Sequence, residues 1–284
     1  MFDCAIVGTG PAGVSAALNL KLHNKNFIWF GTPKLSSKIS SAEKIGNYPG
    51  LSMITGTELQ QAYLQQLQDM DITINDSMVT MISSAGNSFM LLADNVVYKA
   101  KTVILATGVV STRMLPGEAD FVGRGLSYCA TCDGFLYKSK TIAVLCKSKR
   151  FEHEIDYLAE LAEKVYLFAE YKNPETKSTN IEIMTDKCTG ISGGLKLQSV
   201  IMGNDTAIDV DGMFILRDAI APTTLFPGLQ AEKGMIQTDR SMATNIPGCF
   251  ACGDCTGAPY QYVKAAGEGN IAAHSVIRYL ANME

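Results

Sequence analysis

The stretch "FDCAIVGTGPAG", residues 2–13, decides the fold. The apolar run at 2–7 predicts a buried strand, and Pro11 opens a predicted helix over 12–22, which leads to a second predicted strand at 26–30. The turn between strand and helix carries glycines in GxGxxG spacing, which are Gly8, Gly10 and Gly13. This spacing lets a diphosphate approach the backbone and meet the amides of a helix N-terminus. A glycine turn without a ligand is the simpler interpretation, but the strand–turn–helix context favours dinucleotide binding.

Composition restricts the class of protein. The chain has 284 residues, of which 47% are hydrophobic and 18% charged, as expected for a two-domain α/β protein and not for a disordered chain. The net charge of -4 does not suggest nucleic-acid binding. Neither a secretory signal nor an apolar run of the ~18 residues that span a bilayer is visible, so we expect a cytoplasmic protein without membrane contact. Its eight cysteines then favour buried thiols, redox chemistry or metal chemistry over a disulfide framework.

Further elements follow from periodicity. A polar helix is predicted over 57–70, hairpin strands over 88–98, and a buried strand over 102–108. Proline, glycine and charge gather at "RMLPGEADFVGRG" (113–125), where we expect the chain to cross into a second domain. A closing helix is predicted from about 264 to 281, so the C-terminal segment completes the first domain.

A redox dithiol is the second chemical signal. In "SYCATCDGF" (127–135), two residues separate Cys129 from Cys132, and Asp133 follows directly. At a turn entering a helix this spacing can bring two sulfurs to bonding distance, and the helix N-terminus lowers a thiolate pKa. Asp133 stands where a departing thiolate needs a proton. Zinc or inert thiols are the alternatives, but zinc needs two more ligands and the three histidines are not paired at ligand spacing.

A second group of cysteines lies in "GCFACGDC" (248–255). Cys249, Cys252 and Cys255 imitate part of an iron–sulfur ligand run, but the fourth cysteine is missing. Small buried hydrophobes are the favoured interpretation, and no metal site is predicted.

These motifs resemble those of the low-molecular-weight thioredoxin reductases. "GTGPAG", "NYPG", "ATG" (106–108), "LPGE", "CATCDGF", "IPGCFACGD" and "GEGNIAA" occur in the order found in that family, across almost the whole chain. The resemblance implies an α/β fold of two Rossmann-like domains, a homodimer, and thioredoxin as the disulfide substrate. It implies a discontinuous FAD domain at 1–112 and 219–284, and an inserted dithiol domain at 113–218.

The resemblance also implies roles for single residues. Cys132 would face the flavin, Cys129 would attack thioredoxin, and Asp133 would manage protons. The residues implied in FAD binding are Gly8, Gly10, Pro11, Ala12, Gly13, Asn47, Thr107, Gly108, Gly253, Asp254, Gln261 and Tyr262. Without FAD, Asn47 would be an ordinary turn residue and Asp254 a helix cap.

The second domain departs from the family where NADPH should bind. "TIAVLCKSKRFEHEIDYLAELAEKVYLF" (141–168) predicts a strand, a turn, an amphipathic helix and a strand, but the turn "CKSKRFE" has no glycine. Side chains at 147–150 would occupy the place of a diphosphate, and Glu170 in "AEYKN" would repel a 2′-phosphate. Glu170 could bind the ribose of NADH, although the turn without glycine would still leave no space for the diphosphate.

Electrons must then come from another donor. In this respect the chain is similar to the ferredoxin-dependent flavin thioredoxin reductases, so ferredoxin is the expected donor and thioredoxin the expected acceptor. The cations between 138 and 150, without any acid among them, could form a docking patch for an acidic ferredoxin or an ordinary solvated face; they are Lys138, Lys140, Lys147, Lys149 and Arg150. Two alternatives stay open: a diverged reductase using NADH or another protein, and a flavin-bound redox sensor without turnover.

Overall fold

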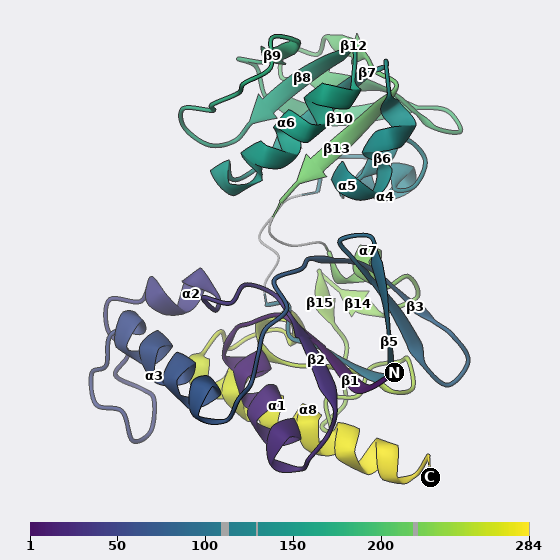
Figure 1. Ribbon diagram of the computed structural model, residues 1–284. Coiled ribbons are helices and arrows are strands. Elements are labelled where there is room, and N and C mark those ends of the chain that lie inside the picture. Colours follow the sequence, from purple (N-terminus) through teal and green to yellow (C-terminus); the bar gives the residue numbers. More distant parts are fainter. Residues whose placement is uncertain (109–113, 129, 218–220, 284) are drawn as a thin grey trace. The chain divides into compact units, whose positions relative to one another are not determined.

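The computed structural model describes residues 1–108, 114–128, 130–217 and 221–283. The chain divides into two compact units, one of Met1–Val110 with Ala221–Glu284 and one of Ser111–Ile220 (Figure 1). The predicted fold class is confirmed: the protein is α/β, and its N-terminal domain is interrupted by an inserted one. Each unit is described below by itself.

Unit 1 is built on a mixed sheet. The strand order is β2 (Phe27–Phe30), β1 (Phe2–Val7), β5 (Val96–Leu105), β4 (Phe89–Ala93) and β3 (Val79–Ser84), and β16 (Cys249–Ala251) pairs with β5. The strands β2, β1, β5 and β16 are parallel neighbours, whereas β3 and β4 extend the sheet as an antiparallel hairpin. The carboxyl ends of β1, β5 and β16 therefore meet at one edge, where α/β sheets bind ligands.

The strand β5 differs from the sequence-based expectation. A hairpin strand ending near 98 and a separate strand from 102 were predicted, but one continuous strand covers Val96–Leu105. Its first half pairs antiparallel with β4, and its second half pairs parallel with β1 and β16. Lys99 and Lys101 flank the fully buried Ala100, and Lys101 pairs with Asp3 at 2.9 Å. Charged residues at alternate positions are compatible with a half-exposed strand.

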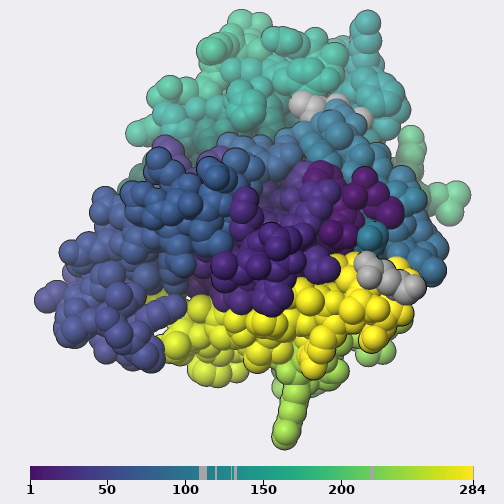
Figure 2. All heavy atoms as spheres, turned by 60° about the horizontal axis from the view of Figure 1, so that its bottom comes forward, coloured from purple at the N-terminus to yellow at the C-terminus, as the bar shows by residue number. Residues whose placement is uncertain are grey.

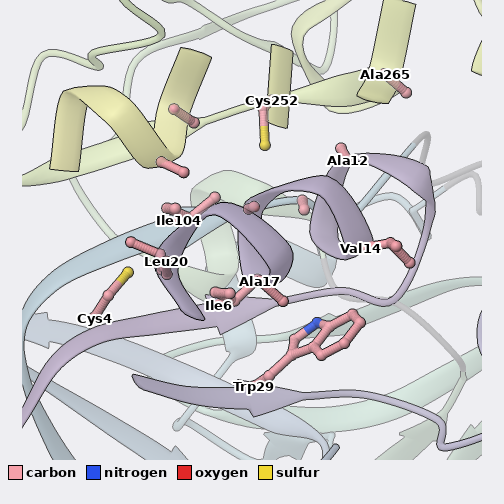
Figure 3. Packing of buried hydrophobic residues seen from close by; sticks show 14 of the residues in the cluster. Cys4, Ile6, Ala12, Val14, Ala17, Leu20, Trp29, Ile104, Cys252 and Ala265 are labelled. Atoms are coloured by element: carbon pink, nitrogen blue, oxygen red, sulfur yellow. The ribbon is translucent and has the colours of Figure 1, made fainter. Parts of the chain in front are cut away.

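Two helices lie against this sheet. α1 (Pro11–Leu22) follows β1 as predicted, and α8 (Tyr262–Ala281) closes the chain. A Cβ on Gly269 of α8 would lie 2.1 Å from the main-chain oxygen of Ala12 in α1, so the two helices pack backbone to backbone. Figure 2 shows the yellow residues of α8 beside the purple N-terminal residues. In Figure 3, α1 lies between the strands that carry Ile6 and Trp29 and the segments that carry Cys252 and Ala265.

The remaining elements of unit 1 are short except for α3. α3 (Gly56–Asp69) begins with a capping box in which Thr55 and Glu58 exchange hydrogen bonds, and it buries Leu59, Tyr63 and Leu67. The other elements are α2 (Ser37–Ser40), α7 (Pro222–Leu225), β14 (Ala231–Glu232), β15 (Met235–Ile236) and the 3₁₀ turn η3 (Gly253–Thr256).

Unit 2 contains a second parallel sheet. Its strand order is β6 (Leu126–Ser127), β13 (Gly212–Leu216), β7 (Thr141–Cys146), β8 (Lys164–Ala169) and β9 (Ile181–Ile183). The helix α6 (Glu152–Leu161) joins β7 to β8 and buries Ile155, Leu158 and Ala159, as the apolar spacing predicted. This βαβ unit is the scaffold of a nucleotide-binding domain.

A small antiparallel sheet and several single turns complete unit 2. The sheet, which the sequence analysis did not foresee, consists of β10 (Cys188–Gly193), β11 (Leu197–Met202) and β12 (Ala207–Asp209). The turns are α4 (Glu118–Phe121), α5 (Ala130–Asp133), η1 (Gly134–Tyr137) and η2 (Lys149–Phe151). Within the described ranges, no helix combines the length and the apolar character needed to cross a bilayer.

Candidate functional site

Two glycines of the first turn are required by the chain itself. Gly8 has φ +112°, and a Cβ there would lie 2.2 Å from the Ala106 carbonyl oxygen. A Cβ on Gly13 would lie 2.0 Å from the Gly8 oxygen, which also accepts a hydrogen bond from Trp29 Nε1 at 2.9 Å. A side chain at either position would push apart β1, β5 and α1. These two glycines therefore shape the turn whether or not a ligand is present.

Gly10 is different, because a Cβ there would meet no atom of the described residues within 4 Å. It is the N-cap of α1, and no side-chain hydrogen bond caps this end of the helix. The first helical residues, Pro11, Ala12 and Gly13, contribute no acidic side chain to the first turn. Open space, uncapped amides and the positive end of a twelve-residue helix together suit a diphosphate.

The structure brings Asn47 and Gln261 together across 214 residues of sequence. Asn47 Nδ2 donates to Gln261 Oε1 at 2.5 Å. The next residue, Tyr262, donates its hydroxyl to the Lys38 carbonyl oxygen at 2.7 Å, and burial raises its pKa. The carboxylate of Asp254 adds to that rise, so the Asn47–Gln261 pair and Asp254 lie in one neighbourhood.

Thr107 and Gly108 follow the carboxyl end of β5, next to the glycine turn. The Thr107 hydroxyl is buried and forms no well-formed hydrogen bond among the described residues, but it lies near enough to the Cys255 thiol to lower the pKa of that thiol. Gly108 has φ +69° and open space at its Cβ position. A buried hydroxyl without a partner is costly, and a bound ligand with a polar edge would remove that cost.

Gly253 and Asp254 form the third side of the site. Gly253 has φ +85°, and a Cβ there would lie 2.9 Å from the Ala12 Cβ, so the turn η3 packs on the first turn of α1. Burial raises the pKa of Asp254, while the charge of Lys264 lowers it. The glycine turn, the end of β5 and η3 thus surround one edge of the sheet.

Lys264 and Glu268, which the sequence analysis missed, hold η3 in place. Lys264 Nζ donates to the carbonyl oxygens of Gly253 at 2.9 Å and Gly257 at 2.8 Å. Glu268 Oε2 accepts from the Gly253 amide at 2.8 Å and pairs with Lys264 at 3.0 Å. Their i, i+4 spacing on the closing helix was the available signal.

The extra cysteines of unit 1 are buried thiols. Cys4, Cys249, Cys252 and Cys255 are free and at most 1% exposed. Burial raises the pKa of Cys4 and Cys249 to about 12 and that of Cys255 to about 11. They are therefore protonated small hydrophobes at neutral pH. No group of three or more metal-ligating side chains occurs among the described residues.

The predicted dithiol is only partly described. Cys129 lies outside the described residues, as does the side chain of Cys132, whose backbone belongs to the single turn α5. Asp133 ends α5 and is half-buried. Its charge adds to the rise of the Tyr137 pKa, which burial causes in the first place, so Asp133 lies near that ring.

The corresponding turn of unit 2 is filled by paired side chains. Lys147 Nζ lies 3.1 Å from Glu170 Oε2, and Lys149 Nζ lies 2.7 Å from Glu175 Oε1. Two of the five cations of the expected docking patch are therefore neutralised by acids from later segments. The patch is therefore less basic than the sequence "CKSKR" suggested. The sequence alone does not show that Glu170 and Glu175 pair with these lysines.

The N-terminus of α6 also carries its own anion. Phe151 is the N-cap, and Glu152 and Glu154 stand in the first helical turn. Glu152 Oε1 accepts a hydrogen bond from the Glu175 amide at 2.8 Å. A carboxylate at this end stabilises the helix dipole and repels a diphosphate. Charge as well as bulk thus disfavours a dinucleotide here.

A buried cluster of Glu118, Tyr128 and Arg217 lies elsewhere in unit 2. Glu118 and Arg217 form an ion pair, and each is 1% exposed. Tyr128 donates its hydroxyl to Glu118 Oε1 at 2.7 Å. Sequence reasoning missed this cluster, although an arginine directly after the apolar run "MFIL" (213–216) was a signal.

Comparisons with known proteins agree with this architecture. The family model for pyridine nucleotide-disulphide oxidoreductases matches residues 2–149 and 164–269. A thioredoxin reductase of Helicobacter pylori is 34% identical, with 99% of each chain covered. The crystal structure of a ferredoxin-flavin thioredoxin reductase from Clostridium acetobutylicum is 42% identical with TM-score 0.90, covering 99% of this chain and 98% of that one. An atypical thioredoxin reductase of Desulfovibrio vulgaris Hildenborough is 27% identical with TM-score 0.69, with 99% of each chain covered.

Proposed function

Because this chain belongs to the pyridine nucleotide-disulphide oxidoreductases, and within them to the thioredoxin reductases, we propose that it reduces thioredoxin with electrons from ferredoxin. It is an oxidoreductase of the thioredoxin reductase type, and the resemblance stated from its motifs is confirmed. The proposed path runs through FAD and a dithiol of Cys129 and Cys132.

The residues of unit 1 fit FAD, the cofactor of this family. Gly10 leaves open space before a helix end that no described side chain caps, and the buried Thr107 hydroxyl, whose nearest described polar partner is the weak Cys255 thiol, supplies a polar partner. Bound FAD supplies a group that takes up electrons singly and delivers them in pairs. We assign its binding to residues 1–112 and 219–284, and the dithiol to residues 113–218.

The chain's own groups have distinct tasks in this assignment. The diphosphate would be held by the turn and first helical residues Gly8, Gly10, Pro11, Ala12 and Gly13. Pro11 contributes only its φ angle, because it has no N–H. Asp254 would contact the ribityl segment, and the charge of Lys264 opposes the rise in the Asp254 pKa that burial causes. The ring system would be oriented by Asn47, Thr107, Gly108, Gln261 and the backbone of Tyr262. Gly253 would stand with Asp254 at the ribityl end of the cofactor.

The dithiol domain completes the transfer. Cys132 is the cysteine that would face the cofactor. In the reduced dithiol, Cys129 attacks the thioredoxin disulfide, which forms a mixed disulfide and releases one thioredoxin thiolate. Cys132 then attacks Cys129, which releases the second thiolate and restores the Cys129–Cys132 disulfide. Asp133 supplies the proton that a departing thiolate needs.

The observation that carries the choice of donor is the filled turn of unit 2. The Lys147–Glu170 pair occupies the turn, and Glu152 places a negative charge at the helix end where a dinucleotide needs a positive one. Ferredoxin delivers electrons by contact and needs no such pocket. The Clostridium acetobutylicum protein, 42% identical, is named for both ferredoxin and flavin.

The reaction is favourable with this donor. A plant-type ferredoxin near -400 mV and thioredoxin near -270 mV differ by ~130 mV, which is ~6 kcal/mol for two electrons. The homodimer and the cytoplasmic location stay predictions.

The test compares three electron donors under anaerobic conditions. NADPH, NADH or reduced ferredoxin is added to the FAD-loaded protein, and flavin absorbance and thiol release from thioredoxin are followed. We expect loss of absorbance and thiol release with ferredoxin alone. Loss of absorbance with NADPH would refute the proposal, and reduction by NADH would support the diverged reductase. Reduction by ferredoxin that leaves thioredoxin oxidised would support the redox sensor.

A cysteine variant tests the dithiol separately. In Cys129→Ser we expect ferredoxin still to abolish the flavin absorbance, while thioredoxin stays oxidised because the attacking thiol is missing. Thioredoxin reduction by this variant at the wild-type rate would show that another thiol is the nucleophile.

A further inference from the structure

Unit 2 contains an ion pair that is removed from water. Arg217 directly follows β13, and Glu118 opens α4, 99 residues earlier in the chain. Arg217 Nη2 donates to Glu118 Oε1, and both side chains are 1% exposed. This pair joins the segment where the chain enters unit 2 to the segment where it leaves.

Tyr128 is bound to the same carboxylate. Its hydroxyl donates to Glu118 Oε1 at 2.7 Å, and the Arg217 Cζ atom lies 4.8 Å from the centre of its ring. Glu118 Oε2 accepts from the Leu115 amide at 2.9 Å. Both carboxylate oxygens of Glu118 thus accept hydrogen bonds. Burial also raises the pKa of the Tyr128 hydroxyl.

The register of the sheet places this cluster beside the dithiol segment. β6 pairs in parallel with β13 through Leu126 with Met213 and Ser127 with Phe214. Tyr128 directly follows β6, as Arg217 directly follows β13, so both stand at the carboxyl edge of the sheet. Cys129 is the residue after Tyr128. The cluster therefore holds the backbone from which the proposed nucleophile continues.

Stability alone does not account for such a pair. Removing two charges from water costs as much as their attraction returns, and apolar replacements of similar volume are often neutral or stabilising. Arg217 adds to the cost, because its Nε and Nη1 atoms are buried without a hydrogen-bond partner among the described residues. A pair that stabilises so little is better explained by the position that it imposes on Tyr128.

We infer that Glu118, Tyr128 and Arg217 are positioning residues that fix the segment entering the Cys129–Cys132 dithiol. The inference rests on the proposed function of that dithiol. The three side chains act through the backbone at Tyr128 and have no chemical step of their own. Removing the ion pair should therefore change how the dithiol reacts even where the fold is intact.

The experiment separates position from stability with single and double variants. Glu118→Gln and Arg217→Met each leave one partner alone, so we expect each to lower the urea midpoint of the FAD-loaded protein. The double variant Glu118→Gln/Arg217→Met contains no buried charge and keeps an acceptor for Tyr128, so its midpoint should return to near the wild-type value. The matched control is Lys164→Met/Glu182→Gln, which removes an exposed ion pair of the same unit at 2.8 Å.

Two measurements report on the dithiol. The first is the pH profile of Cys129 alkylation in the reduced protein, followed by mass spectrometry; buried Cys146 and Cys188, whose pKa is raised to about 11, react slowly. The second is thioredoxin reduction, with kcat and KM determined separately. In the double variant we expect the alkylation midpoint to move by about 0.5 pH units or more. We expect kcat to fall about tenfold with KM for thioredoxin unchanged.

Tyr128→Phe gives a second and milder change, because it removes only the hydroxyl bond to Glu118. We expect the same direction of change in the alkylation profile and in kcat, but smaller. A double variant that matches wild type in both measurements would overturn the inference. So would an equal loss in the Lys164→Met/Glu182→Gln control. Cys129→Ser keeps the two questions apart, since thioredoxin reduction by that variant refutes the proposed function and not the positioning of the segment.

Discussion

The turn after β1 of unit 1 and the turn after β7 of unit 2 share the same backbone context but carry different side chains. Each connects a buried parallel strand to a helix. In unit 1 the turn has glycine at three positions, and the helix end is free of acidic side chains. In unit 2 the turn is filled by Lys147 and its partner Glu170, and Glu152 stands at the helix end. The same scaffold thus supports an anion site in one unit and excludes one in the other.

The difference teaches that a βαβ scaffold provides only a potential anion site. Whether a diphosphate can bind depends on the space at the turn and on the charge in the first helical turn. Both are decided by a handful of side chains.

The largest effect should come from a side chain in the unit 1 turn. Gly13→Ala places a Cβ 2.0 Å from the Gly8 carbonyl oxygen, and a backbone atom cannot move aside easily. We expect a loss of about 3 kcal/mol or more in the free energy of unfolding, together with loss of FAD binding. Urea unfolding and FAD titration of the purified protein measure both.

Gly10→Ala is the matched control, because a Cβ there meets no atom of the described residues within 4 Å. Its unfolding midpoint should stay close to wild type, while FAD affinity falls, since the new methyl group enters the space assigned to the diphosphate. Unchanged FAD affinity in Gly10→Ala would show that the diphosphate does not lie at this turn. Equal destabilisation by both changes would show that the turn tolerates no side chain anywhere.

An intermediate effect on the free energy of unfolding should appear at alkaline pH, because the core of unit 1 contains several buried thiols. Cys4 and Cys249 have a pKa of about 12 in the folded chain against 9.0 for an ordinary thiol. The unfolded state therefore loses protons first, so stability is complete below about pH 9 and declines as the pH rises toward 12. By pH 10, each of these two thiols should lower the free energy of unfolding by about 1.4 kcal/mol.

The measurement is urea unfolding between pH 7 and pH 10, with Cys249→Ala as the control that removes one of these thiols. The variant should lose less stability than wild type over this range. An identical pH dependence in both proteins would contradict the burial of the Cys249 thiol.

The smallest effect should come from the unit 2 turn. Lys147→Ala breaks the pair with Glu170, whose side chain is 45% exposed, so we expect a change below about 1 kcal/mol in the free energy of unfolding. NADPH should still leave the flavin oxidised, because Glu152 remains at the helix end. Lys147→Arg, which keeps the pair, is the control. Flavin reduction by NADPH in Lys147→Ala alone would show that one side chain, and not the charge of the helix end, excludes the nucleotide.

Several features of this fold could be predicted from local sequence. The strand, glycine turn and helix at residues 2–22 follow from a continuous apolar run, a proline at the first helical position and GxGxxG spacing. The helix at Glu152–Leu161 follows from its apolar spacing. The continuous strand β5 was not predicted, because it changes from antiparallel pairing with β4 to parallel pairing with β1, and the sequence does not show these partners.

The candidate site divides in the same way. Its glycines, Asn47 and Gln261 were expected singly from motifs, whereas the hydrogen bond of 2.5 Å between Asn47 and Gln261 appears only in the structure. Lys264 and Glu268, by contrast, gain their importance only from η3, which they hold through backbone hydrogen bonds. The roles of these residues stay proposals, and the dithiol prediction falls on residues whose side chains are not described.

Local sequence alone determined where this chain turns, which faces it buries and where glycine leaves the backbone open, because these properties depend on neighbouring residues. Only the tertiary structure decided which charges are neutralised. Glu118 meets Arg217 and Lys147 meets Glu170 across 99 and 23 residues of sequence, respectively. Such pairs form where strands from distant parts of the chain end at the same edge of a sheet, and no periodicity in the sequence records that meeting.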